Sequence, residues 1–379
     1  MIKRIGSFLL MLSLLLSLFC GCADFTASNN GDIATKATAT KAEIGVGGKD
    51  DTNTLPGNET QPLPGGNFQI HFIDVGQADA ALVICNGKTM LIDGGNKEDS
   101  NLIYSYLKKQ NISYLDYVVC THAHEDHVGG LAGALTAADA GVVFSPVTQY
   151  NSKAFSDFVK KANDRGRQLT VPHAGDRFAL GGATVTVLGP VKEYEEPNDT
   201  SIVLRIVYGE TSFLFTGDME STAEADLLES GATLKSTLLK VGHHGSSTST
   251  SYRFLREVAP KYGVISVGTD NSYGHPTETV LSRLRDADVT LYRTDYCGDV
   301  ICTSDGKTLS FQIKKGEPML ADPSETTGVS EYACIGNLES KKYHRLDCST
   351  LPKEENRIYF TSVEEAEEKG YTPCGRCKP

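Results

Sequence analysis

Tryptophan is absent from the 379 residues, and methionine occurs only five times. Basic residues are also scarce, because 36 Lys and Arg stand against 48 Asp and Glu, which gives a formal net charge of −12 at pH 7. This deficit excludes a global basic field that attracts nucleic acid or anionic lipid, so an anionic substrate would need a local cation such as a metal ion. The 40% hydrophobic content excludes a wholly disordered chain and is ample for a globular core.

Residues 1–22 have the pattern of an export signal. Lys3 and Arg4 precede an apolar run over 5–20, which is shorter than the roughly 20 residues that a spanning helix prefers. The run ends LFCGC and resembles a bacterial lipobox, although Phe19 stands where leucine is usual; Cys22 is then the lipidated first residue of the mature chain. An uncleaved membrane anchor is the alternative. In either case we expect the body to lie outside the cytoplasm, on the outer face of a bacterial cell membrane.

Four further segments follow this signal. Residues 23–67 are rich in Thr, Ala, Gly, Asn, Asp and Pro, a composition that predicts a disordered tether. Residues 68–315 alternate short apolar runs with helical spacing, which predicts an α/β body, and a linker over 316–330 leads to a small unit over 331–379. The predicted strands are 69–74, 80–85, 89–92, 114–120, 184–188, 201–207 and 212–215, with helices around 102–107 and 155–162.

The segment directly after the predicted strand 114–120 reads THAHEDHVGG over 121–130. Three imidazoles and two carboxylates within six residues would repel one another and lose solvation if simply buried, whereas divalent cations satisfy them together. The alternating spacing turns His122 and His124 the same way, and Asp126 with His127 can address a second cation. Glu125 is predicted to be a solvated neighbour.

The pattern His-x-His-x-Asp-His over 122–127 resembles the signature of the metallo-β-lactamase superfamily. That resemblance implies an αββα sandwich with one or two metal ions, Zn or Mn, at the sheet edges. Asp93 and Asp218 match further family positions, with Asp218 as the expected metal-bridging carboxylate. One of His243 and His244 is the expected late metal ligand and the other a substrate contact; His243 ranks slightly ahead because it is nearer the end of a predicted strand over 238–241.

Four phrases narrow the resemblance to the hydrolase domain of the ComEC competence family, over roughly residues 68–314. That family joins the domain to a membrane channel for DNA uptake, and the resemblance implies nuclease activity; a similar pattern occurs in cell-wall phosphorylcholine esterases. The channel segments are absent here, so transport is not implied. Asn198 and Asp199 stand where many relatives of the wider superfamily have a histidine, which would leave room for water or a phosphate oxygen at one metal. The phrases are FIDVGQADA (72–80), NDTSIVL (198–204), LKVGHHGS (239–246) and YGHP (273–276).

These residues favour a metal-dependent phosphodiesterase or nuclease that acts on DNA through a water activated by two metal ions. Asp126 and Asp218 are the main candidate catalytic groups. His275, at the start of a helix opened by Pro276, is a candidate to orient a phosphate, and Lys240 a candidate to line the site; a loop histidine and a surface lysine are the alternatives. Further candidates to support the metals or contact substrate are Asp74, Gln77, Asp79, Asp93, Asn198, Asp199 and Ser246, with a purely structural turn as the alternative for Gln77 and Asp79.

Two other function classes stay open. The first is a hydrolase of another bond, such as a cell-wall phosphorylcholine ester. The second is a non-catalytic lipoprotein that binds DNA or the cell wall and in which the metals only organise the fold.

The C-terminal unit carries a second metal pattern. His344-x3-Cys348 and Cys374-x2-Cys377 suit a tetrahedral structural zinc, which so small a unit needs for stability. The phrase GYTPCGRCKP at 370–379 resembles the zinc-binding module of the Ada DNA-repair protein, but His344 stands where that module has a cysteine, so methyl transfer is not implied. Disulfides are the alternative, since Cys334 makes the number of thiols even.

Whether this unit touches DNA stays open in the sequence. From residue 331 onward it has eight basic and nine acidic residues, a net charge of −1 and a weak footprint for phosphate binding. This charge is compatible with DNA contact, and equally with a unit that only stabilises the fold or that faces the cell wall as an adaptor. Cys297 and Cys302 flank a predicted hairpin. They either form a disulfide or remain as two buried thiols, and the sequence does not choose between these alternatives.

Overall fold

The structure is a computed structural model that describes residues 68–319, 334–345, 348, 350–353, 356–360 and 362–377. The predicted signal over 1–22 with Cys22, the predicted tether over 23–67 and most of the predicted linker over 316–330 lie outside the described residues. Within the described part, no helix is both long enough and apolar enough to cross a membrane.

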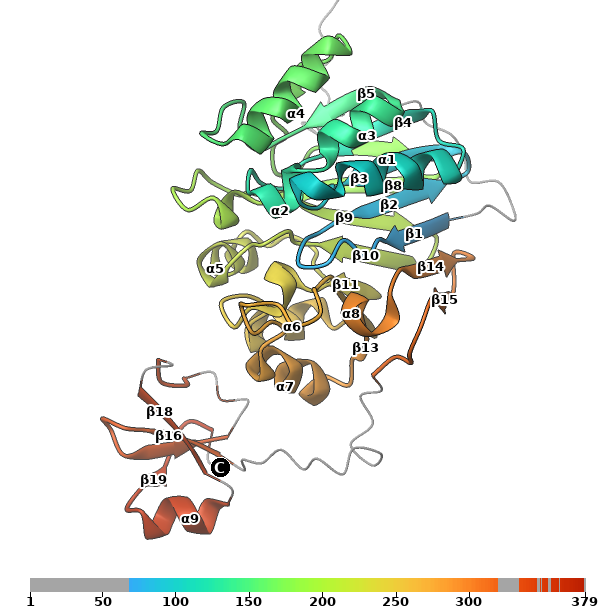
Figure 1. Cartoon of the computed structure of the whole chain (residues 1–379). Helices are drawn as coiled ribbons and strands as arrows, with labels where there is room; N and C mark the ends of the chain where they lie inside the picture. Colours follow the sequence, from blue (N-terminus) through green and yellow to red (C-terminus); the bar gives the residue numbers. More distant parts are fainter. Residues whose placement is uncertain are drawn as a thin grey trace, which may run out of the picture. The chain divides into compact units, whose positions relative to one another are not determined.

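Two sheets packed face to face form the body, and the predicted αββα sandwich is confirmed (Figure 1). The first sheet has the strand order β15-β14-β1-β2-β3-β4-β5-β6. Its strands are β1 (Phe68–Phe72), β2 (Ala81–Cys85), β3 (Lys88–Ile92), β4 (Tyr114–Val119), β5 (Asp139–Phe144), β6 (Leu169–Thr170), β14 (Val300–Ser304) and β15 (Leu309–Ile313).

The second sheet has the strand order β13-β12-β11-β10-β9-β8-β7. Its strands are β7 (Arg177–Leu180), β8 (Ala183–Gly189), β9 (Val203–Tyr208), β10 (Thr211–Phe215), β11 (Leu238–Lys240), β12 (Tyr262–Ile265) and β13 (Thr290–Arg293). Aromatic side chains fill the space between the sheets; for example, Phe68 stacks on Phe213 and Phe72 on Phe215. Strands that are buried on both faces need apolar residues on both, which is why β10 reads as a continuous buried run.

Helices cover the outer faces of both sheets (Figure 1). Those on the first sheet bury an apolar stripe, such as Ile103 and Leu107 of α1. The helices are α1 (Ser100–Lys109), α3 (Leu131–Ala137) and α4 (Lys153–Asp164) on the first sheet, α5 (Ser221–Glu229), α6 (Tyr252–Val258) and α7 (Glu278–Asp286) on the second, and the short α2 (Glu125–Val128) and α8 (Thr294–Cys297). The strands and helices predicted from apolar spacing are therefore present, with ends shifted by at most two residues.

Parallel strand pairing brings the predicted site residues to one edge of the sandwich. Strands β3, β4 and β5 are parallel neighbours in the first sheet, as are β10, β11, β12 and β13 in the second. The chain leaves the carboxyl ends of β3, β4, β10 and β11 directly into Asp93, the 121–127 segment, Asp218 and the 241–246 turn. Open α/β sheets bind ligands at such carboxyl ends.

Close backbone packing holds the 121–130 segment against the turn that follows β3. Gly94 donates its amide to the His127 carbonyl at 2.7 Å, and a Cβ on Gly130 would overlap the Gly94 carbonyl oxygen. Only glycine at these two positions lets the backbones approach so closely.

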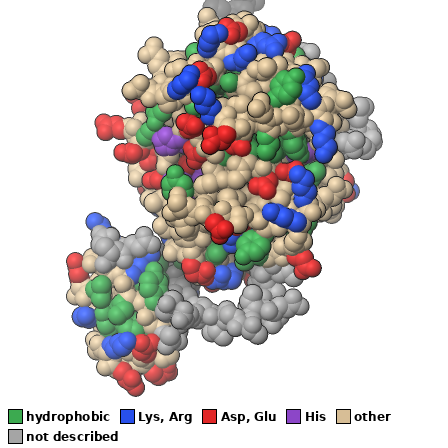
Figure 2. Space-filling view, in the orientation of Figure 1, with side chains coloured by type: hydrophobic (Ala, Val, Ile, Leu, Met, Phe, Trp, Pro, Cys, Tyr) green, Lys and Arg blue, Asp and Glu red, His purple; other side chains and the backbone are tan. Residues whose placement is uncertain are grey.

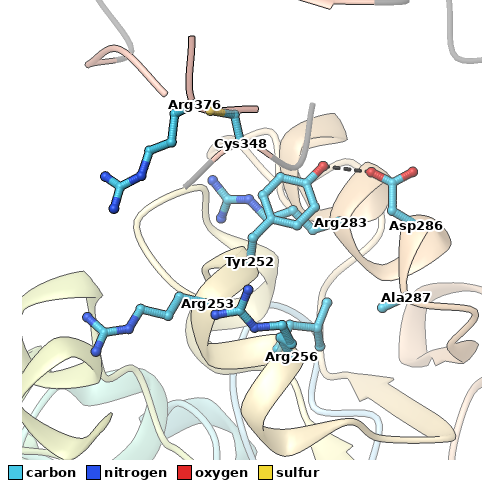
Figure 3. Close-up of a pocket in the computed structure, with 9 residues that line it drawn as sticks. Tyr252, Arg253, Arg256, Arg283, Asp286, Ala287, Cys348 and Arg376 are labelled. Carbon is cyan, nitrogen blue, oxygen red and sulfur yellow. Dashed lines mark hydrogen bonds between the residues drawn. The ribbon is translucent and has the colours of Figure 1, made fainter. Parts of the chain in front are cut away.

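The turn after β11 is held from its other side by α7. Arg283 donates to the backbone carbonyls of Ser249 and Thr250 at 3.0 and 3.2 Å. Its guanidinium also lies over the ring of Tyr252, whose hydroxyl donates to Asp286 (Figure 3). Residues 243–250 therefore rest on a packed, hydrogen-bonded support.

In the described residues of the C-terminal unit, a small sheet of strand order β18-β16-β17-β19 is accompanied by one helix. Cys334, Tyr343 and Phe360 form its core. The elements are β16 (Cys334–Asn337), β17 (Lys342–His344), β18 (Arg357–Phe360), α9 (Val363–Glu368) and β19 (Thr372–Pro373). All eight cysteines among the described residues are free, so Cys297 and Cys302 are buried thiols here.

Candidate metal centre

Four residues at the sheet edge place donor atoms at the mutual distances of ligands around one ion. Nε2 of His127 lies 3.2 Å from Oδ1 of Asp218 and 3.9 Å from Oδ2 of Asp126. Nε2 of His244 lies 3.3 Å from the same Asp126 oxygen and 3.6 Å from Oδ2 of Asp218. Four atoms at about 2.1 Å from a tetrahedral cation are about 3.4 Å from one another, so the spacing fits a divalent metal.

The donor atoms of this cluster are also left without other partners. Nε2 of His127, Nε2 of His244 and Oδ1 of Asp218 are buried and have no hydrogen bond among the described residues. Buried polar atoms rarely stay unsatisfied, because each loses the solvation it has in water. A cation at this position would satisfy all three.

Carboxylate and carbonyl groups behind the imidazoles fix which ring nitrogen faces the cluster. Nδ1 of His127 donates to Oδ2 of Asp93 at 2.9 Å, and Asp93 also accepts from the amide and hydroxyl of Thr121, both at 2.7 Å. Nδ1 of His244 donates to the Ser266 carbonyl at 3.0 Å. Each Nε2 is therefore left as a lone-pair donor aimed into the cluster, as metal-binding histidines require.

His122 and His124 form a second pair of donors beside the first cluster. Nε2 of His122 and Nδ1 of His124 are 3.1 Å apart, and the His122 ring lies 4.1 Å from that of His127. Burial and the neighbouring imidazoles hold the pKa of His122 well below its usual range, so its nitrogen stays neutral and available to a metal. The rings of His122 and His124 thus turn toward the same point, as their spacing in the sequence predicts.

The negative charge of the carboxylates dominates the electrostatics of this site. Burial opposes the charged form of His244, yet the carboxylates of Asp218 and Asp79 raise its pKa to about 10. Burial likewise opposes ionisation of Asp126, but His127 and His244 lower its pKa to about 2. The site therefore has the charge balance of a cation-binding centre.

The structure reverses the predicted order of His243 and His244. His244 is buried and lies within the four-residue cluster, whereas His243 lies outside it, with 22% of its side chain exposed. Both residues have left-handed backbone, at φ values of 49° and 52°, and Gly245 follows at 85°. This turn points the second ring, not the first, at Asp126. Left-handed residues other than glycine are strained and concentrate at functional sites.

His243 remains at the rim of the site. Its Nε2 is 3.7 Å from Oδ2 of Asp218, and its Nδ1 is 3.3 Å from Oε1 of Glu220. Glu220 was not among the residues predicted from sequence, because it belongs to no motif and is joined to His243 only by the fold. Asn198 donates to the same Glu220 oxygen at 3.1 Å, while Asp199 accepts the Glu220 amide and so supports the start of α5.

Lys240 lies behind the metal cluster in this geometry, and its catalytic role stays a prediction. Lys240 is buried, and its Nζ forms a 2.9 Å ion pair with Oδ2 of Asp79 and donates to the Val241 carbonyl. Oδ1 of Asp79 in turn lies 3.4 Å from Nδ1 of His244. Lys240 therefore acts behind the metal cluster by holding the carboxylate that faces His244.

Three other predicted residues support loops around the site. The Gln77 side chain accepts the Gly268 amide at 3.1 Å, which ties the first turn to the loop after β12. Oδ1 of Asp74 accepts the amide of Gly76 at 3.4 Å within the same turn. Ser246 contacts Thr248, whose hydroxyl reaches Nδ1 of His243 at 3.3 Å.

His275 lies beside this rim but not in the ligand cluster. Its ring packs edge-on against that of His243, with centroids 5.7 Å apart. Helix α7 begins at Glu278 with Thr277 as its N-cap, so the prediction that Pro276 opens this helix is wrong. His275 therefore lies at the rim of the site and precedes the first turn of α7.

A separate metal centre is present in the C-terminal unit. The ligand atoms of His344, Cys348, Cys374 and Cys377 lie within 4.8 Å of one another. Backbone amides of Cys377 and Arg376 lower the pKa of the Cys374 thiol to about 7, which favours the thiolate that binds zinc. Cys334 is buried in the apolar core, and its sulfur faces the Ser362 carbonyl at 3.9 Å, so it is not a fifth member.

Comparisons with known proteins agree with both centres. Residues 73–269 match the profile of the family described as Metallo-beta-lactamase superfamily, and residues 326–379 match the profile described as Metal binding domain of Ada. The chain is 28% identical to ComE operon protein 3 of Bacillus subtilis (strain 168) over 286 residues, which cover 69% of this chain and 35% of that protein.

Two further proteins also align with this chain. The chain is 31% identical over 241 residues to Competence protein ComA of Neisseria gonorrhoeae, with 63% of this chain and 32% of that protein covered. It thus spans about a third of the length of these curated relatives. The metallo-beta-lactamase fold protein YhfI from Bacillus subtilis aligns at 12% identity and a TM-score of 0.44, over 63% of this chain and 100% of that chain.

Replacement of Asp126 should remove metal from the body. Asp126→Asn takes away one charge and one ligand atom, and we expect the affinity for zinc or manganese to fall more than about 100-fold. The neighbouring Glu125 is exposed, so Glu125→Gln is a matched control that should bind metal as the wild type does. Metal content per chain after dialysis against a chelator measures the difference, and equal contents in both variants would contradict the ligand assignment.

Replacement of Cys374 should remove one zinc from the C-terminal unit. We expect Cys374→Ser to lose one equivalent of zinc per chain, because three ligands hold the ion less tightly than four. Cys334→Ala should retain that zinc, since Cys334 packs in the core. Zinc content after reduction and alkylation under native conditions is the measurement; a metal-free wild type whose cysteines do not react with the alkylating reagent before reduction would favour the disulfide alternative.

Proposed function

This chain belongs to the metallo-beta-lactamase superfamily and is a metal-dependent hydrolase of that fold, and we propose that it cleaves phosphodiester bonds of DNA as an exported, lipid-anchored nuclease. The proposal has a chemical part, which depends on the metal centre, and a cellular part, which depends on residues 1–22.

The observation that carries the chemical part is the position of Asp218. Its two carboxylate oxygens lie among His127, His243 and His244, and its charge also acts on His122. A carboxylate between two sets of donors suits a pair of divalent ions. When bound, such ions would polarise a phosphoryl oxygen and lower the pKa of an attacking water.

The residues of the chain supply orientation and a proton. Oε1 of Glu220 lies 3.3 Å from Nδ1 of His243 and orients the ring, and Nε2 of the same ring lies 3.7 Å from Oδ2 of Asp218. From this position the ring can exchange a proton with the leaving oxygen of the broken ester. Asp93 and the Asp79–Lys240 pair hold His127 and His244 in place during the reaction.

The net charge of −12 does not argue against a polyanionic substrate. Acidic side chains gather beside an exposed histidine on the face of the body in Figure 2, and bound cations invert the sign of the potential locally. Arg253 and Arg256 also project from the outer side of α6, where both are exposed (Figure 3). The body therefore carries exposed basic side chains despite its acidic composition.

Cleavage of labelled single- and double-stranded DNA tests the chemical part. The full chain, supplied with manganese or zinc, should cut DNA, and Asp126→Asn should lower the rate more than about 100-fold because it loses a metal ligand. Glu125→Gln should cut at the wild-type rate. If the metal-loaded wild type leaves DNA intact but hydrolyses phosphorylcholine esters, the nuclease proposal is wrong and the wall-esterase alternative is supported.

Fatty-acid labelling in a bacterial host tests the cellular part. The wild type should incorporate a radiolabelled fatty acid and fractionate with membranes, whereas Cys22→Ser should incorporate none because the acceptor thiol is gone. Equal labelling of the two chains would overturn the lipid anchor without affecting the chemical part.

A further inference from the structure

Tyr273 is the most exposed large apolar or aromatic side chain among the described residues. Its exposed fraction is 71%, against 57% for Tyr296, the next in rank. The Tyr296 ring is capped by the guanidinium of Arg293, which lies 4.6 Å from its centroid. Tyr273 instead stacks on the His275 ring, with centroids 5.7 Å apart and planes inclined by 26°. One face of Tyr273 is thus supported, and the ring as a whole stays open to solvent.

A series of ring contacts connects Tyr273 to the metal centre. His275 lies between Tyr273 and His243, at 5.7 Å from each ring. Nε2 of His243 lies 3.7 Å from Oδ2 of Asp218. Two ring contacts therefore connect Tyr273 to a residue beside the candidate metal ligands.

The loop that carries Tyr273 is held in place at both ends. The Asn271 side chain donates to the carbonyls of Gly268 and His275 and accepts the His275 amide, so the loop closes on itself. Beyond it, Thr277 donates its amide to the Gly245 carbonyl at 2.9 Å, which ties the loop to the metal-binding turn. A preorganised ring loses little conformational entropy when a ligand stacks on it.

We propose that Tyr273 is a stacking platform for the nucleobase next to the phosphate that is cleaved. The inference rests on the proposed nuclease function and adds the part of the substrate that is recognised. Base-on-aromatic stacking tolerates any base, because every base has a π face, so the platform would select for a nucleic acid strand with an unpaired base rather than for a sequence.

The same ring could in principle recognise a choline group, whose quaternary ammonium binds aromatic faces. Such sites are usually cages of several aromatic rings. Among the described residues, the aromatic ring that Tyr273 contacts is the imidazole of His275, and that contact uses one face of a flat stack. A single open, flat face fits a planar base better than a spherical cation.

Binding of short oligonucleotides separates these possibilities. The probes are a fluorescent tetrathymidylate and an abasic tetranucleotide of the same charge, both with a cleavage-resistant phosphorothioate backbone. The metal-loaded full chain should bind the base-containing probe about 5- to 140-fold more tightly, which corresponds to about 1–3 kcal/mol of stacking. Tyr273→Ala should abolish this preference, and Tyr273→Phe should retain it. Tyr296→Ala is the matched exposed-tyrosine control and should also retain it.

Three outcomes would overturn the stacking proposal. The first is equal binding of both probes by the wild type, and the second is a base preference that is unchanged in Tyr273→Ala. The third is tight binding of phosphorylcholine that displaces neither probe and that Tyr273→Ala abolishes. Failure of the nuclease proposal would give a different combination of binding and cleavage results. In that case the base preference and its loss in Tyr273→Ala would persist, while labelled DNA with a natural backbone would stay uncut.

Discussion

Buried negative charge at one sheet edge is the constraint on which the rest of the site depends. Asp79, Asp93 and Asp218 are each at most 5% exposed. Among the described residues their ion-pair partners are imidazoles and one lysine, and Thr121 also donates to Asp93. Such a group of carboxylates is stable in a protein interior only with matching cations. Lys240 balances Asp79, and the imidazoles balance the others in part. The remaining negative charge is left for metal ions. Metal binding therefore explains why these residues lie together, which packing alone does not.

Much of the fold could be predicted from sequence because its strands are short runs rich in apolar residues that alternate with helical spacing. The 121–127 segment could likewise be assigned to metal binding, since its charged residues stand together in the chain. The order of His243 and His244 could not be predicted, because it depends on a left-handed turn that tertiary packing imposes. The role of Lys240 depends on Asp79, a partner far away in sequence, and Glu220 carries no local signal at all.

The two centres use different chemistry for different ends. In the body, oxygen and nitrogen ligands, a half-exposed rim and an ordered set of supporting carboxylates and carbonyls suit a site that admits a substrate. In the C-terminal unit, three sulfurs and one imidazole, with backbone amides facing the sulfurs, suit a closed structural ion. A core of a few residues around Cys334 and Phe360 is too small to hold that sheet together by apolar burial alone.

The place of β1 in the first sheet sets an order for folding. Phe68 is paired with Cys85 of β2 on one side and with Ser304 of β14 on the other. Until β14 arrives, β1 is an exposed sheet edge with an apolar sequence, which is a typical starting point for aggregation. Contacts between residues so distant in sequence also slow folding. A nascent chain that lacks β14 and β15 is therefore a natural client for chaperones, and any expression of the body alone must extend through Ile313 to close the sheet.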